Sequence, residues 1–330
     1  MVWGMKKRLF ISIASALVGL CLVLMWWFNH EPPRFDPVEK SRVHAQAHGH
    51  RVVTGYTTTA ALIEVVDVML NKRGGYLSND ILPPWILLDN VPNWEFGVLT
   101  QVRDLARAMR NDFSRSQTQS TEDPDLAEAD PLFHYDSERW IPPDTEGRYR
   151  NAVKAMEAYL GRLSDPSSPN AQFYARADNL RDWLAIVEKR LGSLSQRLSA
   201  SAGQQRLNTD LAGDAEARQS TTAAELIEVH TPWLQVDDVF YEARGTTWAL
   251  IHFLRAMESD FDEVLRNKNA LVSFRQIIRE LESSQEPLRA PVVLNGSKFG
   301  ALANHSLMMA NYIARANAAI IDLRNLLSQG

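Results

Sequence analysis

The sequence contains a single cysteine and no excess of basic residues, and both shortages exclude classes of function. Cys21 alone cannot form an intramolecular disulfide, and one thiol cannot hold a thiolate metal cluster. The 330 residues carry a formal net charge of −5. Nucleic-acid binding depends on a basic footprint, so we expect no nucleic-acid partner.

Common catalytic and cofactor motifs are also missing. The chain has no G-x-S-x-G, H-E-x-x-H or G-x-G-x-x-G pattern. Four histidines (His30, His44, His48 and His50) lie close together, but no acidic or cysteine partner stands at ligand spacing, so we interpret them as solvated and expect neither metal nor cofactor. These absences favour a non-enzymatic protein. The many acidic residues leave a carboxylate-dependent enzyme open as the alternative.

A long run without charge, residues 9–28, follows Lys6, Lys7 and Arg8. Twenty residues at ~1.5 Å each span the ~30 Å hydrocarbon core of a bilayer. The basic residues before the run predict a cytoplasmic N-terminus, with residues 29–330 outside the cytoplasm. Bulky aromatics stand where a signal peptide would need a small-residue cleavage site. We therefore interpret residues 1–28 as a cytoplasmic stub and an uncleaved transmembrane anchor.

The rest of the chain predicts an all-α fold. Residues 29–55, with three prolines, indicate a linker, and residues 56–330 indicate a helical domain. Apolar residues recur there at helical spacing, and no strand-like alternation of useful length is present. Residues 200–220 indicate a second linker. Thr222 with Glu225 forms a capping box that predicts the start of another helix.

Two stretches predict a coiled-coil hairpin at about 146–200. Apolar residues step by four and three over 149–163 and again over 173–198, which is a 3.5-residue seam. Ser168 and Pro169 between them are a suitable N-cap and first helical residue. The spacing therefore predicts two antiparallel helices packed on each other.

An internal duplication is the other regularity. Residues 84–113 align without gaps on 232–261, with ten identities in thirty positions, where composition alone gives about two. Matches upstream extend the units to about 57–113 and 221–261, which suggests a helical bundle with pseudo-twofold symmetry. The repeated tryptophans and aspartates are either structural plugs and loop anchors or the lining of a paired binding groove. The candidate binding residues are Trp85, Asp89, Trp94, Trp233, Asp237 and Trp248.

Three segments, 55–59, 93–97 and 244–250, resemble a proteobacterial family known only as a domain of unknown function. The resemblance implies anchoring in the bacterial inner membrane with a periplasmic body, but no activity and no catalytic residues. The leading hypothesis is an interaction or scaffold module of the cell envelope. Its partners would be the lipid bilayer, through residues 9–28, and an envelope protein. A cell-wall or lipid enzyme and a ligand-binding sensor are the alternatives, and the oligomeric state stays open.

Overall fold

The computed structural model describes residues 2–116, 121–167, 170–201, 203–207, 226–229, 231–232, 235–290, 292–296 and 302–329. The fold is all-α, as predicted, apart from one short ribbon. Its helices are α1 (Val2–Phe28), α2 (Pro37–His48), α3 (Tyr56–Asn71), η1 (Trp85–Leu87), α4 (Asn90–Ala108), η2 (Met109–Phe113), α5 (Pro124–Phe133), α6 (Thr145–Ser164), α7 (Ala177–Ser201), α8 (Val236–Asp260), α9 (Asp262–Asn267), α10 (Leu271–Ser283) and α11 (His305–Ser328).

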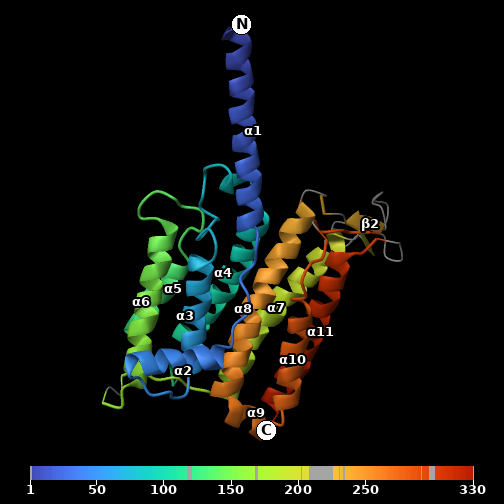
Figure 1. Cartoon of the computed structure of the whole chain (residues 1–330). Coiled ribbons are helices and arrows are strands. Elements are labelled where there is room, and N and C mark those ends of the chain that lie inside the picture. Colours follow the sequence, from blue (N-terminus) through green and yellow to red (C-terminus); the bar gives the residue numbers. More distant parts are fainter. Residues whose placement is uncertain are drawn as a thin grey trace, which may run out of the picture.

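The body is a bundle whose long helices run roughly along one direction, and α1 projects from one end of it (Figure 1). We call this the α1 end and the opposite one the far end, where α2 lies across the bundle. Helices α3, α5 and α6 pack on one side of the body, and α7, α10 and α11 pack on the other. Helices α4 and α8 pack closely along each other and join the two sides.

The contact between α4 and α8 is made by backbone at two glycines. A Cβ atom on Gly97 would lie 2.1 Å from the carbonyl oxygen of Glu242, and one on Gly245 would lie 1.9 Å from that of Trp94. Only glycine permits this approach, because any side chain would overlap the facing helix. Both pairs, 97 with 245 and 94 with 242, are 148 residues apart, so the contact is reciprocal. Two duplicated units would make such a contact; the duplication itself stays a prediction.

The predicted coiled-coil hairpin is wrong. Helix α6 packs on α5 and α3, whereas α7 packs mainly on α11, and the two helices are not packed as neighbours along their lengths. Helix α7 begins only at Ala177, and Phe173 before it packs against Phe113 and Phe261, with ring centroids 5.2 and 5.8 Å apart. The connection is therefore anchored in the core instead of forming a tight turn. Ser168 and Pro169 lie outside the described residues.

The predicted linker at 29–55 is also wrong, because this segment is folded onto the body. Residues 29–36, which we call the strap, lead to α2, and α2 packs on α3 and α8. Asp36 caps α2 by accepting from the amide of Val38 at 2.9 Å. In the strap, Phe35 stacks on His252 of α8, with centroids 4.0 Å apart, and its amide donates to His252 Nε2 at 3.1 Å. Burial lowers the pKa of His252 to about 4, so the ring is neutral and accepts this bond.

Two short strands form an antiparallel ribbon, and an isolated β-bridge pairs Asn295 with Asn304. The ribbon pairs β1 (Gln204–Leu207) with β2 (Leu226–Val229). Strand β2 stands where the Thr222 and Glu225 capping box predicted a helix, so that prediction is wrong for residues 226–229. Apolar and β-branched residues such as Ile227 and Val229 favour strand once a partner is available. Both capping-box residues lie among those the structure does not describe.

Candidate functional site

Two of the predicted groove residues, Trp94 and Trp248, lie inside the core instead. Both side chains are almost fully buried, and their rings meet edge to face at the crossing of α4 and α8, with centroids 5.1 Å apart. Neither indole nitrogen has a hydrogen-bond partner among the described residues. Their large apolar rings contribute buried contact area to the crossing that the two glycines make possible. These two tryptophans therefore cannot line an open groove.

The other predicted tryptophans belong elsewhere. Trp85 is half-buried at the α1 end, where its ring centroid lies 6.0 Å from that of Phe28, in the last turn of α1. Trp233 is in a part of the chain that the structure does not describe. The three described tryptophans, Trp85, Trp94 and Trp248, therefore do not share one exposed surface.

The predicted aspartates Asp89 and Asp237 lie close enough to interact electrostatically, at the adjacent N-terminal ends of α4 and α8. Burial raises the pKa of Asp237, and the charge of nearby Asp89 raises it further. Burial also raises the pKa of Asp238, as do Asp237 and Asp89, while a 2.7 Å hydrogen bond from Asn93 opposes this. The positive ends of two helix dipoles stabilise carboxylates here. Asp89 and Asp238 line a hollow of about 510 Å³ that Glu138 also borders.

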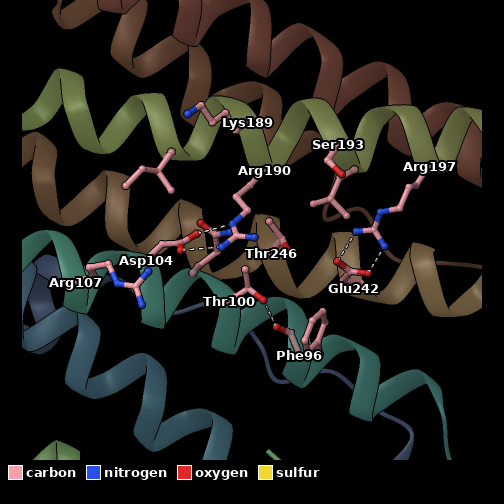
Figure 2. Close-up of a pocket in the computed structure, with 13 residues that line it drawn as sticks. Phe96, Thr100, Asp104, Arg107, Lys189, Arg190, Ser193, Arg197, Glu242 and Thr246 are labelled. Carbon is pink, nitrogen blue, oxygen red and sulfur yellow. Dashed lines mark hydrogen bonds and ion pairs between the residues drawn. The ribbon is translucent and has the colours of Figure 1, made fainter. Parts of the chain in front are cut away.

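A larger groove lies between α4, α7 and α8, and the sequence did not predict it (Figure 2). Its volume is about 640 Å³. Four basic and two acidic side chains line it, which gives a local charge of +2 on a chain whose net charge is −5. We call it the cationic groove. Its charged residues are Asp104, Arg107, Lys189, Arg190, Arg197 and Glu242.

Two arginines of the groove are held in fixed positions by carboxylates (Figure 2). Arg190 donates two hydrogen bonds to Asp104, at 2.8 and 3.0 Å. Arg197 donates two to Glu242, at 2.7 and 2.5 Å. Paired donors of this kind fix the plane of a guanidinium group. Both guanidinium groups stay about half-exposed, so they keep donors for a further ligand.

The remaining two cations have no acidic partner among the residues that the structure describes. Arg107 contacts the ring of His134, with Nη2 and Nε2 2.8 Å apart. Lys189 has no hydrogen-bond or ion-pair partner within the described ranges. These two residues account for the +2 of the groove, because the two carboxylates each neutralise one arginine. The groove therefore attracts negative charge.

One buried polar group beneath the groove is unsatisfied. The Gln101 side chain lines the groove and is 1% exposed, yet neither of its amide atoms has a hydrogen-bond partner among the described residues. An unpaired buried amide costs roughly 1–3 kcal/mol. A ligand or a water entering the groove would recover that free energy.

The sequence did carry a weak signal for this groove. Lys189, Ser193 and Arg197 stand four residues apart on α7, next to its buried seam. That spacing places them on one face, but polar residues beside a seam are usual on any surface helix. The acidic partners come from helices far away in sequence, and no local pattern could assign them.

The histidines of residues 44–50 were predicted to be solvated, but two of them, His44 and His50, contact other side chains. His44 Nδ1 lies 2.9 Å from the hydroxyl of Tyr56 and its Nε2 lies 3.2 Å from Glu157, while His50 Nδ1 is 3.2 Å from the same hydroxyl. These contacts fasten α2 to α3 and α6. Within the described part of the chain, no group of three or more His, Cys, Asp or Glu side chains could hold a metal ion.

The fold defines a class of protein: an all-α body with one exposed apolar helix, α1, near its N-terminus. Residues 10–28 of that helix are long and apolar enough to cross a membrane, and none of this stretch is buried. Such a helix is compatible with a membrane anchor or with a signal sequence.

The chain belongs to a bacterial family. The family model described as "Uncharacterized protein conserved in bacteria (DUF2333)" matches residues 3–330. No curated protein and no solved structure matches the chain.

Proposed function

We propose that this protein is a single-pass, non-enzymatic protein of the bacterial inner membrane, and that its periplasmic body binds an acidic segment of an envelope protein in the cationic groove. The observation that carries the proposal is the groove itself, with two cations that lack acidic partners in the described part of the chain, above an unsatisfied buried amide. The carboxylates of an acidic segment would neutralise the two cations, and the segment could also hydrogen-bond the buried amide of Gln101.

Contacts at the base of α1 support an anchor that is not cleaved. Met25 and Phe28 pack against a cluster of Leu77, Leu88 and Val91 from the body. A Cβ atom on Gly74 would lie 2.7 Å from the Phe28 ring, so the glycine makes room for that ring. The last turn of α1 is therefore part of the folded body, which a signal sequence would not be. Lys6, Lys7 and Arg8 support a cytoplasmic N-terminus.

The spacing of the fixed arginines supports a helical or extended peptide as the ligand. Arg190 and Arg197 are seven residues apart on α7, which is roughly 10 Å along the helix axis. A peptide with carboxylates at a similar spacing can meet both. Phe96, an exposed ring at the groove, offers an apolar contact beside them. The charged lining favours this ligand over the apolar molecule that a sensor domain would enclose.

A peptide-binding experiment tests the proposal. The full chain in lipid nanodiscs is titrated into a fluorescein-labelled peptide of ten glutamates, and binding is followed by anisotropy. We expect the double variant Arg107→Glu/Lys189→Glu to bind at least about tenfold more weakly, because two attractive charges become repulsive. The matched control is Lys154→Glu/Arg279→Glu, which changes the net charge equally at exposed residues outside the groove. Equal loss in both variants would contradict the proposal.

Cross-linking in cells tests the partner. A photoreactive residue at Ser193, exposed in the groove, should capture an envelope protein through an acidic peptide, as identified by mass spectrometry. The same residue at Val272, exposed on α10 away from the groove, is the control. Capture of the same proteins from both positions, or of none, would count against a groove partner.

A carboxylate-dependent enzyme is the second candidate, favoured by the hollow that Asp89, Asp238 and Glu138 share. Burial and like charges raise the pKa of Asp238, as they would for a general acid. Incubation with purified peptidoglycan decides this candidate. Fragment release that Asp89→Asn/Asp238→Asn abolishes would support it, and no release by the wild-type chain would reject it.

A further inference from the structure

An uncharged apolar stretch stands at the α1 end of the body. Residues 81–88 read Ile-Leu-Pro-Pro-Trp-Ile-Leu-Leu, with Asp80 before them and Asp89 after them. Four of its side chains are well exposed instead of packing into the core: Ile81, Leu82, Ile86 and Leu87. Large apolar residues in such a row usually mark a contact surface.

A second loop adds to the same surface. Trp140 and Ile141 are each about half-exposed, and Trp140 borders a hollow together with Ile81, Leu82 and Trp85. Outside α1, fourteen large apolar side chains of the described residues are exposed, and these two loops supply six of them. We call the six the apolar collar: Ile81, Leu82, Ile86, Leu87, Trp140 and Ile141.

The collar lies at the base of the membrane-spanning helix. Trp85, in the middle of the first loop, contacts the ring of Phe28 at the end of α1. Figure 1 shows η1 and the start of α6 at the end of the body from which α1 projects. The collar is therefore continuous with the surface of α1 that a bilayer would cover.

Buried polar contacts hold the two loops in place. Lys72 and Glu95 form an ion pair that is almost fully buried, and Glu95 accepts from the amides of Leu77 and Ser78, both at 2.8 Å. Tyr76 then donates to the carbonyl oxygen of Ser137 at 3.1 Å, which ties the first loop to the second. The apolar side chains are thus presented on a fixed base.

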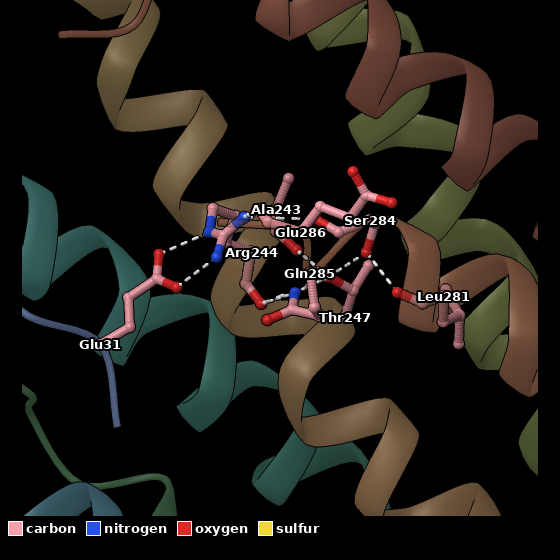
Figure 3. A network of polar contacts seen from close by, with 8 residues as sticks. All are labelled: Glu31, Ala243, Arg244, Thr247, Leu281, Ser284, Gln285 and Glu286. Atoms are coloured by element: carbon pink, nitrogen blue, oxygen red, sulfur yellow. Dashed lines mark hydrogen bonds and ion pairs between the residues drawn. The ribbon is translucent and has the colours of Figure 1, made fainter. Parts of the chain in front are cut away.

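The strap is fixed to the body, so it does not act as a flexible linker that would let the body move away from the membrane. Glu31, three residues after α1, accepts two hydrogen bonds from Arg244, both 2.6 Å long (Figure 3). Arg244 is itself nearly buried, and it also donates to the carbonyl oxygens of Ser284 and Glu286 at 3.3 and 2.9 Å. The chain therefore joins the body directly at the end of the anchor.

We propose that the apolar collar inserts into the interfacial layer of the same bilayer that α1 crosses. This inference rests on the anchor of the proposed function. Tryptophan and aliphatic side chains are stable at the depth of the lipid headgroups, where apolar surface is covered and indole nitrogen can still reach water. The flanking carboxylates of Asp80 and Asp89 limit the depth. Because they are acidic, the contact depends on apolar insertion and needs no anionic lipid.

Depth-dependent quenching tests the collar. Single cysteines replace Leu82 or Ile86 in the Cys21→Ala background, each is labelled with the dye NBD, and the full chain is placed in phosphatidylcholine vesicles. Some vesicles contain lipid with a nitroxide high on its acyl chain. We expect a blue-shifted emission and several-fold stronger quenching at 82 and 86 than at Val272→Cys, an exposed apolar site on α10 that serves as the matched control. Adding anionic lipid should leave the quenching unchanged.

A label at Leu17→Cys, in the middle of α1, separates the collar from the anchor. Quenching at 17 together with quenching at 82 and 86 supports both. Quenching at 17 alone, with 82 and 86 like 272, overturns the collar and leaves the anchor standing. A blue shift at 82 without lipid quenching also overturns it, because a protein surface would then cover the loop. Quenching at none of these sites overturns the collar and the anchor together.

Discussion

The two ends of the body expose different kinds of surface. At the α1 end, the Lys72–Glu95 pair is buried while large apolar side chains face outward. At the far end, fewer large apolar side chains are exposed, Val43 and Val272 among them, and ion pairs such as Asp262–Arg266 face outward. One end thus matches apolar surroundings and the other matches water. Four substitutions probe this contrast, and we order them by expected effect.

Glu95→Ala should have the largest effect, because it leaves the buried ammonium of Lys72 without its carboxylate. We expect a loss of about 3–5 kcal/mol in the free energy of unfolding. Guanidinium denaturation of the full chain in detergent measures it. Glu138→Ala, at an exposed glutamate of the same end, is the control and should change little. A loss below about 1 kcal/mol would mean that the buried pair is not what holds this end.

Asp260→Asn probes a partly buried carboxylate at the far end. Asp260 accepts from the amide and the hydroxyl of Thr58, both at 2.7 Å, yet burial raises its pKa to about 6. The folded state therefore holds this proton more tightly than the unfolded state. The stability that the raised pKa contributes is present below pH 4 and is lost as pH rises through 6. The variant does not titrate here, so the stability of the wild type over the variant should fall by about 2–3 kcal/mol from pH 4 to 7.5. A difference that does not change with pH would contradict the burial effect.

Glu31→Gln weakens the strap that joins the two ends. Arg244 would keep its two carbonyl acceptors but lose the charged one, so we expect a loss of about 1–2 kcal/mol. Hydrogen exchange followed by mass spectrometry should show faster exchange in residues 29–36. Unchanged exchange there would show that Phe35 alone holds the strap.

Asp262→Ala should have the smallest effect. Its pair with Arg266 is exposed at the far end, one turn apart on α9, and water screens such pairs. We expect the same denaturation midpoint as the wild type. A clear shift would show that exposed charge at the far end stabilises the fold, which would weaken the contrast between the ends.

Local sequence predicts the helices of this fold, but it does not predict which helices pack on each other. The seam residues of α7, such as Leu184 and Leu191, are buried as the 3.5-residue spacing predicts. The spacing cannot say which helix covers them, because any apolar stripe of similar width satisfies the same surface. Helix α11 covers them, and the sequence places it more than a hundred residues further on. The hairpin prediction failed at this step.

The strap and the groove show a similar limit. Asp36, Pro37 and Gly49 are standard start and stop signals of a helix, so α2 was predictable from residues that the linker interpretation passed over. The extended strap before it has no periodicity, and its contacts are made by single side chains. In the groove, Arg190 meets Asp104 across 86 residues of sequence. Only the packing of three helices produces that pair.

The strap has a consequence for the order in which the chain assembles during synthesis. Glu31 is among the first residues to follow α1, but its partner Arg244 comes 213 residues later. The partner of Phe35, His252, is separated from it by 217 residues. Contacts so distant in sequence carry a large loop-closure entropy and form late. The segment next to α1 is thus made early but can join the body only after α8 has been made, so the attachment of α1 to the body is a late step of folding.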